Sequence, residues 1–239
     1  MNKFEALFGI KASEVKKNCI LLPLVQKDVL KQFKLKDFKK GKLFSSGNSD
    51  FWTLINTGIG PAWTGDAVLY LKETPCSNIF LFGSCGLVSE KNGLSIGSLV
   101  SPVKCFSNES FSDMLLKGVR EERIYYPARE LYERFMGVNR NAGIKEITCS
   151  TLASLKLEED MLDYFSAKGI DLVDMECSAF FSAASFSGLN ALAFFYITDI
   201  IKKKPFYTSL EPELKTKLVS SVKESANILC EFIKTNLSV

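Results

Sequence analysis

The sequence predicts an α/β fold in which helices flank a central mixed, largely parallel sheet. Short apolar segments of strand length, such as residues 19–25 and 78–82, alternate with helical patterns along the chain. No Pro/Gly/Ser-rich linker divides the 239 residues, and 46% of them are hydrophobic. We therefore expect residues 1–18 to form an N-terminal extension and residues 19–239 to form one domain with a single core.

Apolar spacing and turn residues place the individual elements. Strands are expected at residues 19–25, 51–56, 78–82, 96–103, 144–149, 171–175 and 191–198. Helices are expected at residues 26–33, 62–71, 129–136, 157–167, 176–188 and 210–237, with a shorter one within residues 1–17. Residues 57–61 and 83–86 are expected to form glycine-rich turns, residues 34–50 a surface hairpin or loop, and residues 104–128 an irregular segment.

Composition excludes several classes of function. The net charge of +3, from 30 basic and 27 acidic side chains, is too balanced to indicate a nucleic-acid partner. No apolar run reaches the roughly 18 residues of a membrane span, and no signal sequence is recognisable, so we expect a cytoplasmic protein. The seven cysteines form no CxxC pair and suit buried, reduced thiols. The absence of histidine excludes Ser/His/Asp and Cys/His catalysis and any histidine-ligated metal. The sequence shows no cluster of potential ligands, so we expect neither a metal nor an organic cofactor.

Two carboxylates end neighbouring strands in the stretch 172–201. Glu176 follows the first strand and opens a helix that Gly188 closes, and Asp199 ends the second strand. Ligands of open α/β sheets bind at the carboxyl ends of strands, so Glu176 and Asp199 should flank one site. The alternative is that Glu176 only caps its helix and Asp199 only lies in a solvated turn. The Gly83–Gly86 turn would let the backbone approach a ligand closely, and its amides could bind an oxyanion.

Four separated motifs resemble those of the nucleoside phosphorylase/nucleosidase superfamily, in the same order. These are Asn56–Gly60 (NTGIG) for the S-G-I-G turn, Phe82–Leu87 (FGSCGL) for the G-[ST]-[AC]-G-G loop, Val173–Glu176 (VDME) for the V-E-M-E box, and Ile197–Asp199 (ITD) for the I-S-D segment. The sequence is most similar to nucleosidases of methylthioadenosine, S-adenosylhomocysteine or futalosine. This resemblance implies a three-layer sandwich, usually a homodimer, that cleaves the N-glycosidic bond of a purine nucleoside.

The resemblance also assigns roles to individual residues. Glu176 would bind the ribose hydroxyls, Asp199 would face the purine N7, and Asp28 would activate the attacking water. Cleavage builds positive charge on the ribose and negative charge on the base, which suits a carboxylate at the sugar and a protonated carboxyl at N7. The residues expected to contact the substrate are Ser84, Gly58, Gly83, Cys85, Met175, Thr198, Thr151 and Phe106, with Phe111 as a second candidate near the 5′ substituent.

Three features keep alternatives open. Asp28 is one methylene shorter than the glutamate of the family, and an acidic residue in a first helical turn is favourable without any catalytic role. Phosphorylases carry an arginine where this chain has Leu81, and a Gly-Asp-Pro in the region of Leu22–Leu24, so hydrolysis is favoured over phosphorolysis. The Lys202–Lys204 run could supply cations but suits a solvated loop. An inactive nucleoside-binding homologue is the third hypothesis, and the choice among methylthioadenosine, S-adenosylhomocysteine, futalosine and 6-amino-6-deoxyfutalosine stays open.

Overall fold

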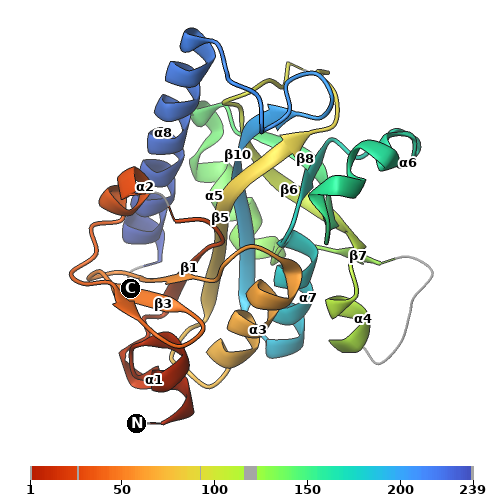
Figure 1. The fold of residues 1–239 in the computed structure, drawn as a ribbon. Coiled ribbons are helices and arrows are strands. Elements are labelled where there is room, and N and C mark those ends of the chain that lie inside the picture. Colours follow the sequence, from red (N-terminus) through yellow and green to blue (C-terminus); the bar gives the residue numbers. More distant parts are fainter. Residues whose placement is uncertain (1, 26, 92, 116–122, 238–239) are drawn as a thin grey trace.

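The structure is a computed structural model that describes residues 2–25, 27–91, 93–115 and 123–237. Within these residues, the strands form one mixed sheet (Figure 1). Their bounds are β1 (Asn18–Leu22), β2 (Lys39–Lys40), β3 (Ser45–Asn48), β4 (Thr53–Asn56), β5 (Asn78–Leu87), β6 (Leu99–Asn108), β7 (Ile124–Tyr125), β8 (Lys145–Leu152), β9 (Leu172–Asp174) and β10 (Asn190–Ile200). The α-helices are α1 (Lys3–Phe8), α2 (Lys27–Gln32), α3 (Pro61–Leu71), α4 (Phe111–Leu115), α5 (Arg129–Val138), α6 (Leu162–Ala167), α7 (Cys177–Ser187) and α8 (Pro212–Asn236).

The sheet closes on itself around five strands. β10 pairs with both β5 and β6, and the order β10-β6-β8-β9-β5 completes the ring. From β5 the sheet continues outward through β1, β4, β3 and β2. β5 is parallel to β1 and β10, and β1 is parallel to β4. The carboxyl ends of these strands therefore share one edge of the sheet, as the sequence predicts.

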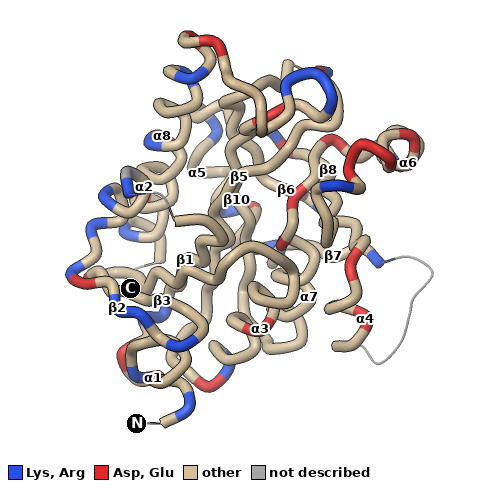
Figure 2. The backbone as a smooth tube through the Cα atoms, in the orientation of Figure 1, with Lys and Arg blue, Asp and Glu red and all other residues tan. Residues whose placement is uncertain are grey.

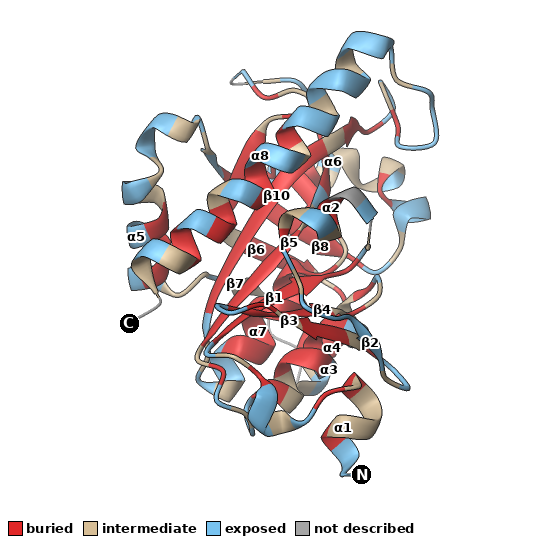
Figure 3. Ribbon diagram, turned by 90° about the vertical axis from the view of Figure 1, so that its left-hand side faces the viewer, coloured by how far each residue is buried: buried red, intermediate tan, exposed pale blue. Residues whose placement is uncertain are grey.

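Helices cover both faces of this sheet, which confirms the predicted α/β fold. Along β1, Cys19 and Leu21 face the core that contains α3 and α7, whereas Ile20 and Leu22 face the core that contains α2, α5 and α8. All five residues of β1 are buried, because both faces of the strand are covered. Figure 3 shows the buried strands between helices whose outer surfaces are exposed.

Two expectations from the sequence are wrong in detail. Residues 83–86 form no turn but continue β5, where they pair in register with β10 as far as a bulge between Ile197 and Asp199. Their backbone groups enter the ladder because β10 extends alongside them, so they form no nest of free amides. Residues 104–108 are likewise regular, since β6 continues to Asn108 beside β8.

The N-terminal residues pack on the body of the protein. Phe4 and Phe8 of α1 stack at 4.2 Å between ring centroids, and both are buried with Phe44. Residues 34–50 form the predicted hairpin, and its strand β3 joins the sheet by pairing with β4. None of the helices that the structure describes combines the length and the apolar character needed to cross a bilayer.

Candidate active site

Glu176 lies at the junction of β9 and α7 and reaches across to a turn that is distant in sequence. Its Oε1 accepts a hydrogen bond of 2.7 Å from the backbone N–H of Gly60, and the side chain is only 6% exposed. Gly60 has a φ of +121°, a conformation that favours glycine, directly before Pro61 starts α3. The turn after β4 therefore holds the Glu176 carboxyl in place, and Glu176 makes no side-chain cap on its own helix.

The environment of Glu176 opposes ionisation. Burial raises the pKa of Glu176 to about 7, although backbone hydrogen bonds from Gly60 and Met175 favour the charged form and oppose that rise. A carboxyl with this pKa exchanges its proton near neutral pH. It can therefore be ionised when a ligand offers hydroxyl donors or a developing positive charge.

Asp174, two residues earlier, performs the capping that the sequence suggested for Glu176. Its Oδ2 accepts hydrogen bonds from the backbone N–H groups of Glu176 (3.0 Å) and Cys177 (2.6 Å) at the start of α7. Its Oδ1 accepts a hydrogen bond of 2.6 Å from the Thr151 hydroxyl, which itself accepts from the N–H of Ser178. Asp174 thus fixes the helix start that carries Glu176. No pattern in the sequence distinguishes the roles of these two acidic residues.

Asp199 lies on β10 opposite the end of β5. It is 6% exposed, and its Oδ1 accepts a hydrogen bond of 2.7 Å from the hydroxyl of Thr198. Its Oδ2 lies over Gly86, where a Cβ atom would come within 3.1 Å of it. Burial raises the pKa of Asp199, while the Thr198 hydrogen bond opposes that rise. Asp199 therefore holds its proton more tightly than an exposed aspartic acid does, which is the direction that a proton donor requires.

Five of the expected substrate contacts lie on β5, on β10 or directly after β9. Ser84 is exposed on β5, and Gly83 and Met175 are half-buried. Cys85 is buried, and its thiol points toward a backbone carbonyl of β10. The Thr198 hydroxyl also donates to the Cys85 carbonyl at 3.3 Å. The end of β5 and the end of β10 are thereby tied together around the candidate site.

The other expected contacts have different surroundings. Thr151 is fully buried and supports Asp174. Phe106 and Phe111 are also buried, at 8% and 7% exposure. Gly58 has a φ of +79° in the turn that leads to Gly60. Asp28 has its backbone in α2, but its side chain lies outside the part of the chain that the structure describes.

Three cysteines come together close to Asp174. The sulfur atoms of Cys105, Cys149 and Cys177 lie within 4.8 Å of one another, although the spacing of these residues along the chain does not indicate a cluster. All three are completely buried, and burial raises the pKa of Cys149 and Cys177 well above the ordinary value. Burial also opposes ionisation of Cys105, but hydrogen bonds with Cys149, Cys177 and Thr151 lower its pKa to about 5. Metal ligation needs thiolates, and two of the three thiols resist losing their protons. We assign the three thiols to the packing of β6, β8 and α7.

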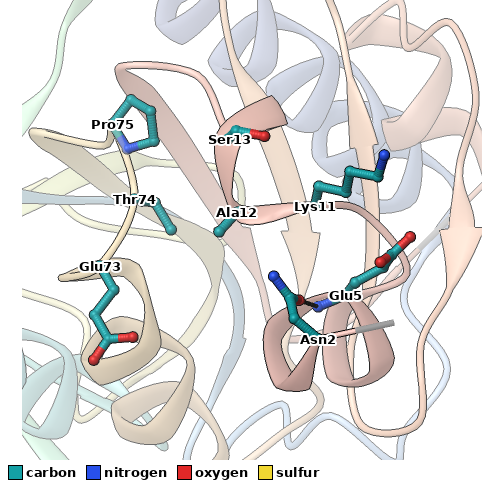
Figure 4. A pocket seen from close by; sticks show the side chains of 8 residues that line it. All are labelled: Asn2, Glu5, Lys11, Ala12, Ser13, Glu73, Thr74 and Pro75. Atoms are coloured by element: carbon teal, nitrogen blue, oxygen red, sulfur yellow. Dashed lines mark hydrogen bonds between the residues drawn. The ribbon is translucent and has the colours of Figure 1, made fainter.

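Other surface features lie apart from the carboxyls. A depression of about 660 Å³ is lined by α1, the loop after it and the end of α3, where Glu5, Lys11 and Glu73 carry mixed charge (Figure 4). A second, of about 460 Å³, lies beside α5. Acidic and basic residues are interspersed along the chain in Figure 2, in line with the small net charge. Neither depression has a lining that indicates a class of ligand.

Comparison with known proteins agrees with the fold and the motifs. Residues 14–234 match the model of the family described as the phosphorylase superfamily. The chain belongs to this superfamily. Its members are nucleoside-processing enzymes, both nucleosidases and nucleoside phosphorylases. A comparison with curated proteins finds no match.

Solved structures with the superfamily fold include both reaction types. AMP nucleosidase from Bacteroides thetaiotaomicron is 18% identical with a TM-score of 0.73, over 97% of this chain and 95% of that one. The 5′-methylthioadenosine/S-adenosylhomocysteine nucleosidase of Campylobacter jejuni is 14% identical with a TM-score of 0.72, over 93% and 100%. Purine nucleoside phosphorylase from Toxoplasma gondii is 16% identical with a TM-score of 0.74, over 98% and 99%. Identities this low establish the shared fold, and the reaction must be argued from the site.

Proposed function

We propose that this member of the phosphorylase superfamily hydrolyses the N-glycosidic bond of a 5′-substituted purine nucleoside. The observation that carries the proposal is the pair of buried carboxyls, Glu176 and Asp199, at one edge of the sheet. Their pKa values are both raised by burial, and the hydrogen bonds that oppose the rise come from backbone amides and Thr198, not from a described lysine or arginine. Such a site suits a substrate that becomes positively charged at the sugar while its base needs a proton.

In this mechanism the two carboxyls have opposite protonation states. Protonated Asp199 donates to N7 of the purine as the C–N bond breaks, which neutralises the leaving base. Ionised Glu176 accepts hydrogen bonds from the ribose hydroxyls and stabilises the positive charge of the oxocarbenium-like sugar. Asp28 is proposed as the group that deprotonates the attacking water on the opposite side of the sugar.

Hydrolysis is favoured over phosphorolysis because this chain lacks the arginine that phosphorylases carry two residues before the glycine-rich loop. Leu81, where phosphorylases carry an arginine, is completely buried in β5. Within the Lys202–Lys204 run, Lys203 forms an ion pair with Glu90 on the surface. A phosphate dianion next to apolar side chains without a cation would be strongly disfavoured.

The test is purine release from methylthioadenosine, S-adenosylhomocysteine, futalosine, 6-amino-6-deoxyfutalosine, adenosine and inosine, with and without phosphate. We expect release without phosphate from at least one 5′-substituted nucleoside. Asp199→Asn should lower kcat by at least about a hundredfold, because the amide cannot supply the proton. Strict dependence on phosphate would replace hydrolysis by phosphorolysis. Binding without release under any condition, unchanged by Asp199→Asn, would indicate a nucleoside-binding homologue.

A further inference from the structure

The turn that holds Glu176 contains two glycines in conformations that other residues rarely adopt. Gly58 and Gly60 have φ values of +79° and +121°, and a Cβ atom at either position would meet no atom of the described residues within 4 Å. Packing therefore does not confine the glycines on this side, and glycine restricts the backbone least of all residues. The N–H of Gly60 nevertheless donates to Oε1 of Glu176 at 2.7 Å. Other contacts must fix the turn in the conformation that makes this hydrogen bond.

Two buried threonine hydroxyls tie the turn to the helix that follows it. Thr57, at the start of the turn, and Thr64, in the first turn of α3, are 2% and 0% exposed. The Thr64 hydroxyl donates to the Thr57 hydroxyl at 3.3 Å, and the Thr57 hydroxyl donates to the carbonyl of Gly58 at 2.9 Å. These two hydrogen bonds link α3 to the backbone that leads into Gly60.

Backbone hydrogen bonds anchor both ends of this link. The N–H of Thr57 donates to the carbonyl of Leu22 at the end of β1 (3.0 Å), and the N–H of Thr64 donates to the carbonyl of Gly60 (3.2 Å). The helix α3 also packs beside α7, which begins directly after Glu176 (Figure 1). The two hydroxyls therefore join fixed backbone segments across the glycines of the turn.

Packing alone does not require hydroxyl groups at these positions. Valine has nearly the shape of threonine, and replacing two hydrogen-bonded partners by apolar groups of the same shape is often neutral for stability. A threonine inside a helix usually donates to the carbonyl four residues earlier, whereas Thr64 donates to Thr57. We propose that Thr57 and Thr64 are positioning residues that hold the Gly60 N–H against the Glu176 carboxyl. This inference rests on the proposed role of Glu176 at the ribose.

Loss of the link should change Glu176 in a defined direction. Burial raises the pKa of Glu176, and the hydrogen bond from Gly60 favours the charged form and limits that rise. A displaced Gly60 N–H should therefore raise the pKa of Glu176 beyond about 7. Less of the carboxylate that binds the ribose would then be present near neutral pH. Asp174, whose charge interacts with that of Glu176, keeps its own hydrogen-bond partners in such a variant.

The test follows the carboxyl carbon of Glu176 by NMR as the pH is varied, with its signal assigned by its loss in Glu176→Gln. In Thr64→Val the pKa of Glu176 should rise by at least about 0.5. Thr64→Ser keeps the hydroxyl and should leave the pKa unchanged. The matched control is Thr53→Val, which removes a buried hydroxyl at the other end of β4, where it donates to Asn48. This control should also leave the pKa of Glu176 unchanged.

A second variant and the reaction itself complete the experiment. Thr57→Val removes the same link from its other end and should give the same rise, so the inference stays testable if one variant does not fold. Thr64→Val should also lower kcat/KM for the cleaved nucleoside by at least about tenfold, and Thr64→Ser should retain it. An unchanged pKa in the folded valine variants, an equal rise in Thr53→Val, or an unchanged kcat/KM would overturn the positioning role. The expected rise in a protein that cleaves no nucleoside would refute only the hydrolase.

Discussion

Replacing Glu176 by glutamine should stabilise the protein at neutral and alkaline pH. Burial raises the pKa of Glu176 from its ordinary value of 4.5 to about 7. This rise corresponds to a loss of roughly 3 kcal/mol in the free energy of unfolding when the buried carboxyl ionises. The folded protein holds the proton more tightly than the unfolded chain, so stability falls as the pH rises through the window between these values. Glutamine stays neutral and keeps an oxygen for the Gly60 N–H, so Glu176→Gln escapes this loss.

Urea unfolding at two pH values measures the effect. Glu176→Gln should raise the free energy of unfolding by about 3 kcal/mol at about pH 8 and by less than about 1 kcal/mol at about pH 5. Glu224→Gln, on the exposed side of α8, should change it by less than about 0.5 kcal/mol at both values. A stabilisation of Glu176→Gln that does not depend on pH, or a destabilisation at pH 8, would refute the argument that burial sets this pKa.

Two glycine substitutions test the packing around the site. Gly86→Ala places a Cβ 3.1 Å from Oδ2 of Asp199. The rate of base release should fall by at least about tenfold, because the added methyl group displaces the carboxyl. An unchanged kcat would show that this contact does not hold Asp199 in place. Gly65→Ala places a Cβ 2.3 Å from the ring of Phe111. The free energy of unfolding should therefore fall by about 1–3 kcal/mol. An unchanged urea midpoint would contradict the close packing of Phe111 against Gly65. Gly137→Ala, with no atom within 4 Å of the added Cβ, is the control for both.

The sequence was sufficient to predict that Glu176 and Asp199 lie at one edge of the sheet. Apolar runs of strand length located β9 and β10, and Gly188 marked the end of α7, where it has a φ of +71°. The expectation rested on the alignment of the carboxyl ends of parallel strands. That rule holds for β10, which is parallel to β5, but β9 is antiparallel to β5. Val173 of β9 and Asp199 of β10 both pair with Gly86, and this pairing brings the two strands to the end of β5.

The failures concern positions where a distant partner decides the local structure. Residues 83–86 look like a turn because they contain two glycines, yet pairing with β10 makes them strand. The choice of Asp174 as the cap of α7 depends on Thr151, which comes from β8.

The buried carboxyls can be divided by the number of donors that the chain itself supplies. Asp174 receives the Thr151 hydroxyl, the Cys149 thiol and two backbone N–H groups, which is close to what a carboxylate can accept. Asp199 receives one hydroxyl from the described residues, and Glu176 receives only the backbone N–H groups of Gly60 and Met175. A buried acid that the chain satisfies stabilises the fold, whereas one left short of donors costs stability until a ligand supplies them. The deficit is concentrated at Glu176 and Asp199, the two carboxyls between which the nucleoside is proposed to bind.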